Sequence, residues 1–86
     1  MPTISVVFGI IIRMFYRDHN PPHFHAEHQG QNATFDFNGK QLEGEIDSRT
    51  AKVLIRKWAQ LHKAELNKNW ENMRQRKTFI RIEPLK

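Results

Sequence analysis

The chain has 86 residues, too few to divide its apolar side chains between two cores, so we expect residues 1–86 to form a single domain. It has no cysteine, which excludes disulfides, thiolate metal ligands and a cysteine nucleophile. Its 14 lysines and arginines exceed its 9 aspartates and glutamates, which gives a formal net charge of +5. These properties fit a small basic protein, which we expect to be cytoplasmic.

The first half of the chain reads as β-structure. Residues 4–8 and 10–17 are rich in Val, Ile, Phe and Tyr, and Gly9 separates them as a bend. The apolar run over residues 6–12 is far too short to span a bilayer. We therefore interpret this run as buried strand and expect no association with a membrane.

Alternation predicts two further strands. Residues 23–28 place apolar side chains on one face and His23, His25 and Glu27 on the other. Residues 33–37 alternate in the same way. The sequence therefore predicts a sheet with one apolar face.

The remaining strand signals lie at a turn and near the C-terminus. The pair Asn38-Gly39 favours a two-residue type I′ turn, which leads into a strand over residues 40–46. Residues 78–82 predict a last short strand before Pro84.

From Ser48 onward the apolar period becomes helical. Asp47 or Ser48 is suited to cap the helix. The positions at helical spacing are Ala51, Leu54, Ile55, Trp58, Leu61 and His62. A separate stripe follows, formed by Leu66, Trp70 and Met73, which predicts a break near residues 62–65 and a second helix to about Arg76.

The order of these elements predicts the fold class. It is α+β: a mostly antiparallel sheet from the N-terminal half and a short C-terminal strand, with two helices packed on one face.

The segment Asp18-His19-Asn20-Pro21-Pro22-His23-Phe24-His25 is the most informative part of the chain. It contains three of the five histidines, a carboxylate and two prolines in eight residues. Clustered imidazoles bind metals and phosphates and transfer protons near neutral pH. The two prolines force an extended or turning loop. The segment therefore marks a candidate site.

One interpretation of this segment is a metal site. His23 and His25 lie two apart on the predicted strand, so both imidazoles project from one face. They could bind one divalent ion such as zinc, with Asp18, His19 or Glu27 as a third ligand.

Other interpretations need no metal. His23 and His25 could act as general acid and base in cleaving RNA, with Arg13 or Arg17 stabilising the developing charge. Protonated histidines and an arginine could instead hold a phosphate or carboxylate. A structural corner, whose side chains cap a turn beside the prolines, is also open.

The second half of the chain carries the positive charge. Residues 1–48 hold three Lys/Arg and six Asp/Glu, a net of −3, whereas residues 49–86 hold eleven and three, a net of +8. Arg49, Lys52 and Arg56 lie on the first helix, opposite its apolar stripe. They could follow a phosphate backbone, meet an acidic protein or simply be solvated.

The whole pattern resembles a bacterial family, the domain of unknown function numbered 4160. The resemblance is carried by Gly9-Ile10-Ile11-Ile12, Asp18 to His25, Leu42-Glu43-Gly44-Glu45, Trp58, Leu61-His62, Glu65-Leu66, Asn69-Trp70 and Ile82-Glu83-Pro84-Leu85. Members of that family are often encoded beside a second small domain of unknown function, numbered 2442. The resemblance implies a small protein partner from the same operon and a toxin–antitoxin-like module, without implying a reaction.

We therefore expect a toxin–antitoxin-like operon component that acts on or near nucleic acid, with its site at Asp18–His25. The alternative is a non-enzymatic module that binds a protein or a ligand, with or without a metal ion. The sequence leaves open whether the protein is an enzyme. An unpaired sheet edge is compatible with a homodimer.

Overall fold

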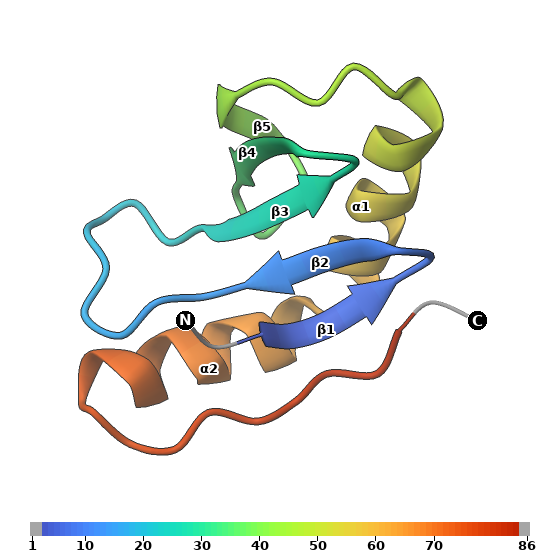
Figure 1. Ribbon diagram of the computed structural model, residues 1–86. Helices are drawn as coiled ribbons and strands as arrows, with labels where there is room; N and C mark the ends of the chain where they lie inside the picture. Colours follow the sequence, from blue (N-terminus) through green and yellow to red (C-terminus); the bar gives the residue numbers. More distant parts are fainter. Residues whose placement is uncertain (1–2, 85–86) are drawn as a thin grey trace.

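The computed structural model describes residues 3–84, which form five strands followed by two helices (Figure 1). The elements are β1 (Thr3–Val7), β2 (Ile10–Arg13), β3 (Phe24–His28), β4 (Gln31–Phe35), β5 (Gln41–Gly44), α1 (Arg49–Leu61) and α2 (Lys63–Arg74). The strands follow the order β1-β2-β3-β4-β5 and each neighbouring pair is antiparallel. The predicted α+β class is confirmed.

The hairpin of β1 and β2 turns at Phe8 and Gly9, which both have positive φ, 49° and 78°. This conformation suits a two-residue hairpin turn. β2 ends at Arg13, so the predicted strand over residues 10–17 is too long. The reason is the partner strand: Arg13 pairs with His25 near the start of β3, and the chain then leaves the sheet.

β3 and β4 confirm the predicted alternation. Phe24 and Ala26 are buried, as are Ala33 and Phe35 opposite them. Their neighbours along each strand are partly exposed. The sheet therefore presents one apolar face to the core.

The loop between β4 and β5 differs from the predicted type I′ turn at Asn38-Gly39. The Gly39 N–H donates to the Asp36 carbonyl, and the Asp36 N–H donates to the Lys40 carbonyl, both at 2.9 Å. Three residues, 37–39, thus lie between the hydrogen-bonded pair Asp36 and Lys40, and of these Gly39 alone has positive φ, 89°. This geometry keeps Phe37 buried in the core, and the strand that follows is shorter than predicted.

The two helices meet at His62, inside the predicted break. Ser48 caps α1, its Oγ accepting the Ala51 N–H at 3.1 Å. Leu61 was predicted to continue the apolar stripe and is instead 66% exposed, because the chain turns into α2 immediately after it. No helix within residues 3–84 is long and apolar enough to cross a membrane.

Aromatic contacts join the helices to the sheet. Trp58 of α1 meets Phe24 of β3 edge-on, with ring centroids 5.6 Å apart. Trp70 of α2 meets Phe37 in the same manner at 6.2 Å. The predicted stripe on α2, formed by Leu66, Trp70 and Met73, is buried.

Residues 78–82, predicted as a strand, form no strand and do not belong to the sheet. Their backbone link to β1 is the bond from the Ile82 N–H to the Ile4 carbonyl, at 2.8 Å. The side chains of Asn69 and Trp58 bond other backbone groups of the segment and its continuation. Because side chains take the place of a strand partner, no ladder forms.

Candidate functional site: a histidine–carboxylate cluster

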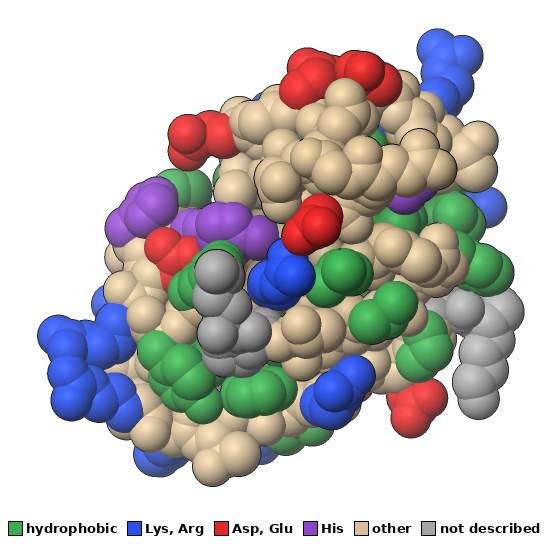
Figure 2. All heavy atoms as spheres, viewed as in Figure 1, with side chains coloured by type: hydrophobic (Ala, Val, Ile, Leu, Met, Phe, Trp, Pro, Cys, Tyr) green, Lys and Arg blue, Asp and Glu red, His purple; other side chains and the backbone are tan. Residues whose placement is uncertain are grey.

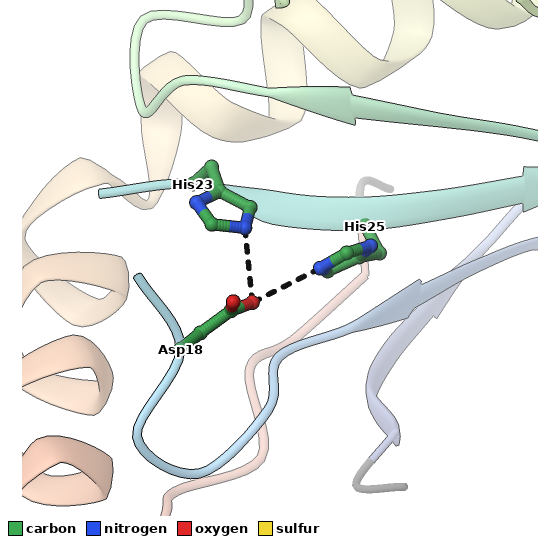
Figure 3. Close-up of side chains that lie close together, drawn as sticks. All are labelled: Asp18, His23 and His25. Carbon is green, nitrogen blue, oxygen red and sulfur yellow. Dashed lines mark hydrogen bonds and ion pairs between the residues drawn. The ribbon is translucent and has the colours of Figure 1, made fainter. Parts of the chain in front are cut away.

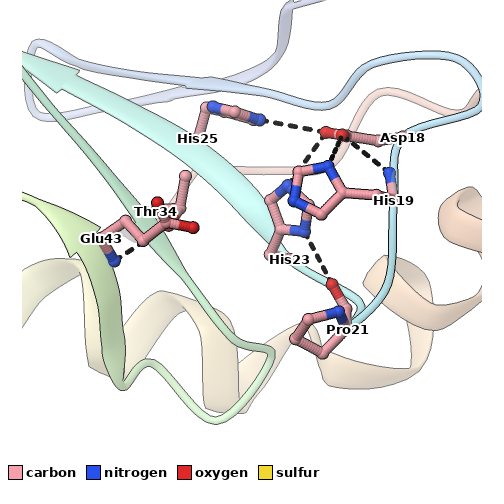
Figure 4. Close-up of polar contacts among 7 residues, drawn as sticks. All are labelled: Asp18, His19, Pro21, His23, His25, Thr34 and Glu43. Carbon is pink, nitrogen blue, oxygen red and sulfur yellow. Dashed lines mark hydrogen bonds and ion pairs between the residues drawn. The ribbon is translucent and has the colours of Figure 1, made fainter.

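Three histidines converge on the carboxylate of Asp18. One of its oxygens, Oδ2, lies 2.9 Å from His23 Nε2 and 3.1 Å from His25 Nε2 (Figure 3). The other, Oδ1, accepts the backbone N–H of His19 at 2.9 Å and lies 3.1 Å from its Nδ1 (Figure 4). The structure therefore brings together the histidines that the sequence singled out.

The loop between β2 and β3 creates this convergence. A turn at Tyr16 and Arg17, with φ of 57° at Arg17, reverses the chain before Asp18. The two prolines follow, and the Asn20–Pro21 peptide bond is cis. The loop thus carries the carboxylate back over the start of β3, where His23 and His25 lie.

His23 is held from both sides and is only 4% exposed. Its Nδ1 lies 2.7 Å from the Pro21 carbonyl oxygen, and since a carbonyl can only accept, Nδ1 carries the hydrogen and donates it. Its ring also packs against Trp70, with centroids 5.5 Å apart. His23 is therefore a fixed part of the site.

The other ring nitrogen of His23, Nε2, faces the carboxylate of Asp18. In the neutral ring Nε2 has no hydrogen, yet it lies 2.9 Å from a carboxylate oxygen, which also can only accept. Two such atoms repel each other unless a positive charge accompanies them. A proton held between Nε2 and the carboxyl group, or a cation beside both atoms, removes this repulsion.

His25 is more accessible than His23, since its side chain is 33% exposed. Its Nε2 is hydrogen-bonded to Asp18 Oδ2, and its ring stands edge-on to Phe15 with centroids 4.4 Å apart. These contacts orient the ring while leaving part of it open.

The surroundings of Asp18 favour its charged form. Burial acts to raise the pKa of the carboxyl group. This effect is outweighed by the hydrogen bonds from His25 and from the His19 backbone, together with the charges of His23 and His25. The pKa of Asp18 therefore lies below its ordinary value of 3.8.

A hollow of about 390 Å³ opens beside the cluster. Its lining residues are His19, Pro21, His23, His25, Thr34, Leu42 and Glu43. Histidine side chains gather at the surface on this side of the molecule (Figure 2). The hollow has the size of a small-molecule site, for which the usual range is about 300–1,000 Å³.

Arg13 was predicted as a charge-stabilising residue and Glu27 as a metal ligand, but in the structure they pair with each other. The Arg13 guanidinium donates to Glu27 Oε1 at 2.7 Å, so each satisfies the other's charge. Of the three predicted candidates for a third ligand, Asp18 is the one that forms a group with His23 and His25 in which all ligand atoms lie within 4.8 Å of one another. Arg17 is exposed in the turn that precedes Asp18.

Arg49, Lys52 and Arg56 are not part of the cluster. They line a separate hollow beside α1, together with Lys40, which the sequence analysis did not single out. The Pro21 carbonyl and Trp70, the partners of His23, were likewise not predicted. Neither could be read from spacing, because Trp70 is distant in sequence and a carbonyl carries no sequence signal.

The comparisons with known proteins point to one family. A family model described as "Domain of unknown function (DUF4160)" matches residues 9–71 of the 86, a span that contains the whole cluster. Neither the curated proteins nor the solved structures gave a significant match.

Proposed function

Because the chain belongs to the DUF4160 family, whose description names no reaction, we propose a function from the site itself: the protein binds a divalent transition-metal ion, such as zinc, through Asp18, His23 and His25. Their ligand atoms all lie within 4.8 Å of one another. Imidazole and carboxylate are ordinary zinc ligands, at about 2.0–2.2 Å. Small movements of the side chains would bring all three to that distance from one ion.

The bond between His23 Nδ1 and the Pro21 carbonyl is the observation that carries this proposal. Histidines that bind metals almost always donate their other ring N–H to a carbonyl or carboxylate. The bond fixes the tautomer and turns Nε2 toward Asp18 and His25. A metal ion there would also remove the repulsion between Nε2 and the carboxylate oxygen.

Three protein ligands would leave at least one coordination position open. Closed structural zinc sites use four protein ligands, whereas catalytic sites keep a position for water or substrate. The open position would face the hollow of about 390 Å³ beside the cluster. An ion held in this way acts as a Lewis acid or activates a water molecule.

The test is a titration of dialysed protein with zinc, nickel and manganese, followed by calorimetry and by the NMR signals of the histidine rings. We expect one ion per chain, with shifts at His23 and His25. His25→Ala should weaken binding strongly, since it removes one of three ligands. His28→Ala is the matched control, because it removes an imidazole from the same strand outside the cluster. Equal affinity in the two variants would refute the proposal.

A second candidate is acid–base chemistry on RNA without metal, within a toxin–antitoxin-like pair. It is favoured by the hydrogen bond between His25 and Asp18, which would orient His25 as a general base. His19 and His25 line the hollow and are the exposed histidines there, whereas His23 is buried. The acid–base pair in this case is His19 and His25, which replaces the pair predicted from the sequence.

Expression of the protein without its operon partner distinguishes acid–base chemistry without metal from chemistry at a metal site. Growth arrest that requires both His19 and His25, and RNA cleavage that persists in a chelator, would support acid–base chemistry without metal. Cleavage that stops in chelator and returns with zinc would support the metal site instead. Arrest that survives loss of both histidines would exclude catalysis by this cluster.

A further inference from the structure

A second hollow, of about 460 Å³, lies between α1 and the loop that joins β4 to β5. It is lined by Phe35, Asn38, Gly39, Lys40, Gln41, Arg49, Lys52, Val53 and Arg56, and we refer to it as the basic pocket. Four of these residues are lysine or arginine, and none is aspartate or glutamate. Such a lining is suited to an anion.

In the part of the chain that the structure describes, the positive charges of the basic pocket lack acidic partners. Within residues 3–84, none of the four cations lies within 4.0 Å of a carboxylate. Arg49, Lys52 and Arg56 follow one another at spacings of three and four on α1, so they share one face of the helix. Like charges at these spacings repel, and a bound anion would relieve that repulsion.

The pocket is held in shape by contacts of its loop with α1 and with Lys63, the first residue of α2. Gly39 lies so close to the helix that a Cβ on it would stand 2.6 Å from the Cα of Arg56. The Asn38 side-chain oxygen accepts from Lys63 Nζ at 2.7 Å, and its carbonyl accepts from Gln60 Nε2 at 3.2 Å. A site whose walls are already fixed loses less entropy when it binds a ligand.

We propose that the basic pocket binds the phosphate group of a nucleotide, either free or within a nucleic-acid strand. Arginine guanidinium groups match the geometry of phosphate oxygens, and Arg49 and Arg56 both line the pocket. The volume exceeds what a phosphate alone requires, and Val53 adds an apolar wall for the attached sugar or base. The ligand class is therefore a phosphate ester.

This site is independent of the metal site. None of the three proposed metal ligands lines it, and β5 lies between the two hollows, with Gln41 lining the basic pocket and Leu42 and Glu43 lining the other. Loss of one site would therefore leave the other testable.

The test uses the full chain, titrated at fixed salt with inorganic phosphate, ATP and a short oligouridylate, and followed by amide NMR and by affinity. We expect shifts at Gly39, Lys52 and Arg56. The double variant Arg49→Gln/Arg56→Gln should weaken binding by about tenfold or more, because each arginine makes a charge-assisted bond to phosphate. Arg74→Gln/Lys77→Gln is the matched control, since it removes the same charge from exposed residues outside the pocket.

The outcomes separate the ligand sources. Binding of ATP with shifts confined to the pocket identifies a free nucleotide, and binding of the oligouridylate alone identifies a strand. Both support the proposal when only the pocket variant loses affinity. Equal weakening by both double variants would show a general attraction between charges and would overturn it, as would the absence of binding by all three probes.

Discussion

His23 donates its Nδ1 hydrogen to the carbonyl of Pro21 across 2.7 Å, and this bond decides which ring nitrogen faces Asp18. A histidine on a flexible loop would be free to present either nitrogen. Here the proline two residues earlier fixes the choice, so the cluster presents two Nε2 atoms to one carboxylate oxygen. The candidate chemistry of the protein rests on this arrangement.

The two histidines of the cluster should differ in their contribution to stability. His23→Ala should lower the free energy of unfolding by about 2–3 kcal/mol, because it leaves a cavity beside Trp70 and removes a buried hydrogen bond. His25→Ala should cost about 1 kcal/mol, since its ring is partly exposed. Urea unfolding in the absence of metal measures both values. A larger cost for His25→Ala would mean that the burial of His23 does not stabilise the fold.

The lowered pKa of Asp18 predicts a dependence of stability on acid. Because the folded state favours the carboxylate, Asp18 contributes stability above its ordinary pKa of 3.8. That contribution is lost as the pH falls through the lower pKa of the folded state. The difference in unfolding free energy between the parent protein and Asp18→Asn should therefore shrink with acidification below about pH 4. Urea titrations across that range test it, and a difference that grows with acid would contradict the shift.

Asn69 should hold the C-terminal segment in place. Its side chain is fully buried, donates to the Ile80 carbonyl at 2.6 Å and accepts the Ile80 N–H at 2.7 Å. Asn69→Ala should cost about 2–3 kcal/mol and speed hydrogen exchange at the Ile82 amide, since two backbone groups lose their partners. The exposed Asn67→Ala is the control and should change stability by less than about 0.5 kcal/mol. Unchanged exchange at Ile82 would show that the segment is held without Asn69, by β1 and Trp58.

Gly39 and Gly30 allow backbone strain to be separated from steric contact. Both have positive φ, 89° and 83°, but a Cβ would meet the Arg56 backbone at Gly39 and nothing within 4 Å at Gly30. Gly30→Ala should therefore cost about 1 kcal/mol from strain alone, and Gly39→Ala about 2 kcal/mol or more. Thermal or urea unfolding compares them. Equal costs would mean that the loop can move away from α1, and the basic pocket would then lack a fixed wall.

Much of the fold was predictable because its signals are local. The alternation around Phe24 and Ala26 predicted a strand, and the apolar spacing through Trp58 and Trp70 predicted two helices with a break between them. Predictions failed where a long-range contact decided the outcome, as two segments show. The turn at Asn38-Gly39 adapts to the burial of Phe37 and to α1, and residues 78–82 meet side chains where a strand partner was expected.

The sequence alone indicated where the candidate site would be, since three histidines and an aspartate lie within eight residues. Only the tertiary structure decided which side chains of the cluster are buried and which are paired. Folding buried His23 against Trp70 and paired Arg13 with Glu27, so Asp18 became the common partner of the histidines. Folding also made Lys40 and Arg56 line the same pocket. Spacing along a chain fixes which side chains can meet, but their burial and pairing depend on residues that are distant in sequence.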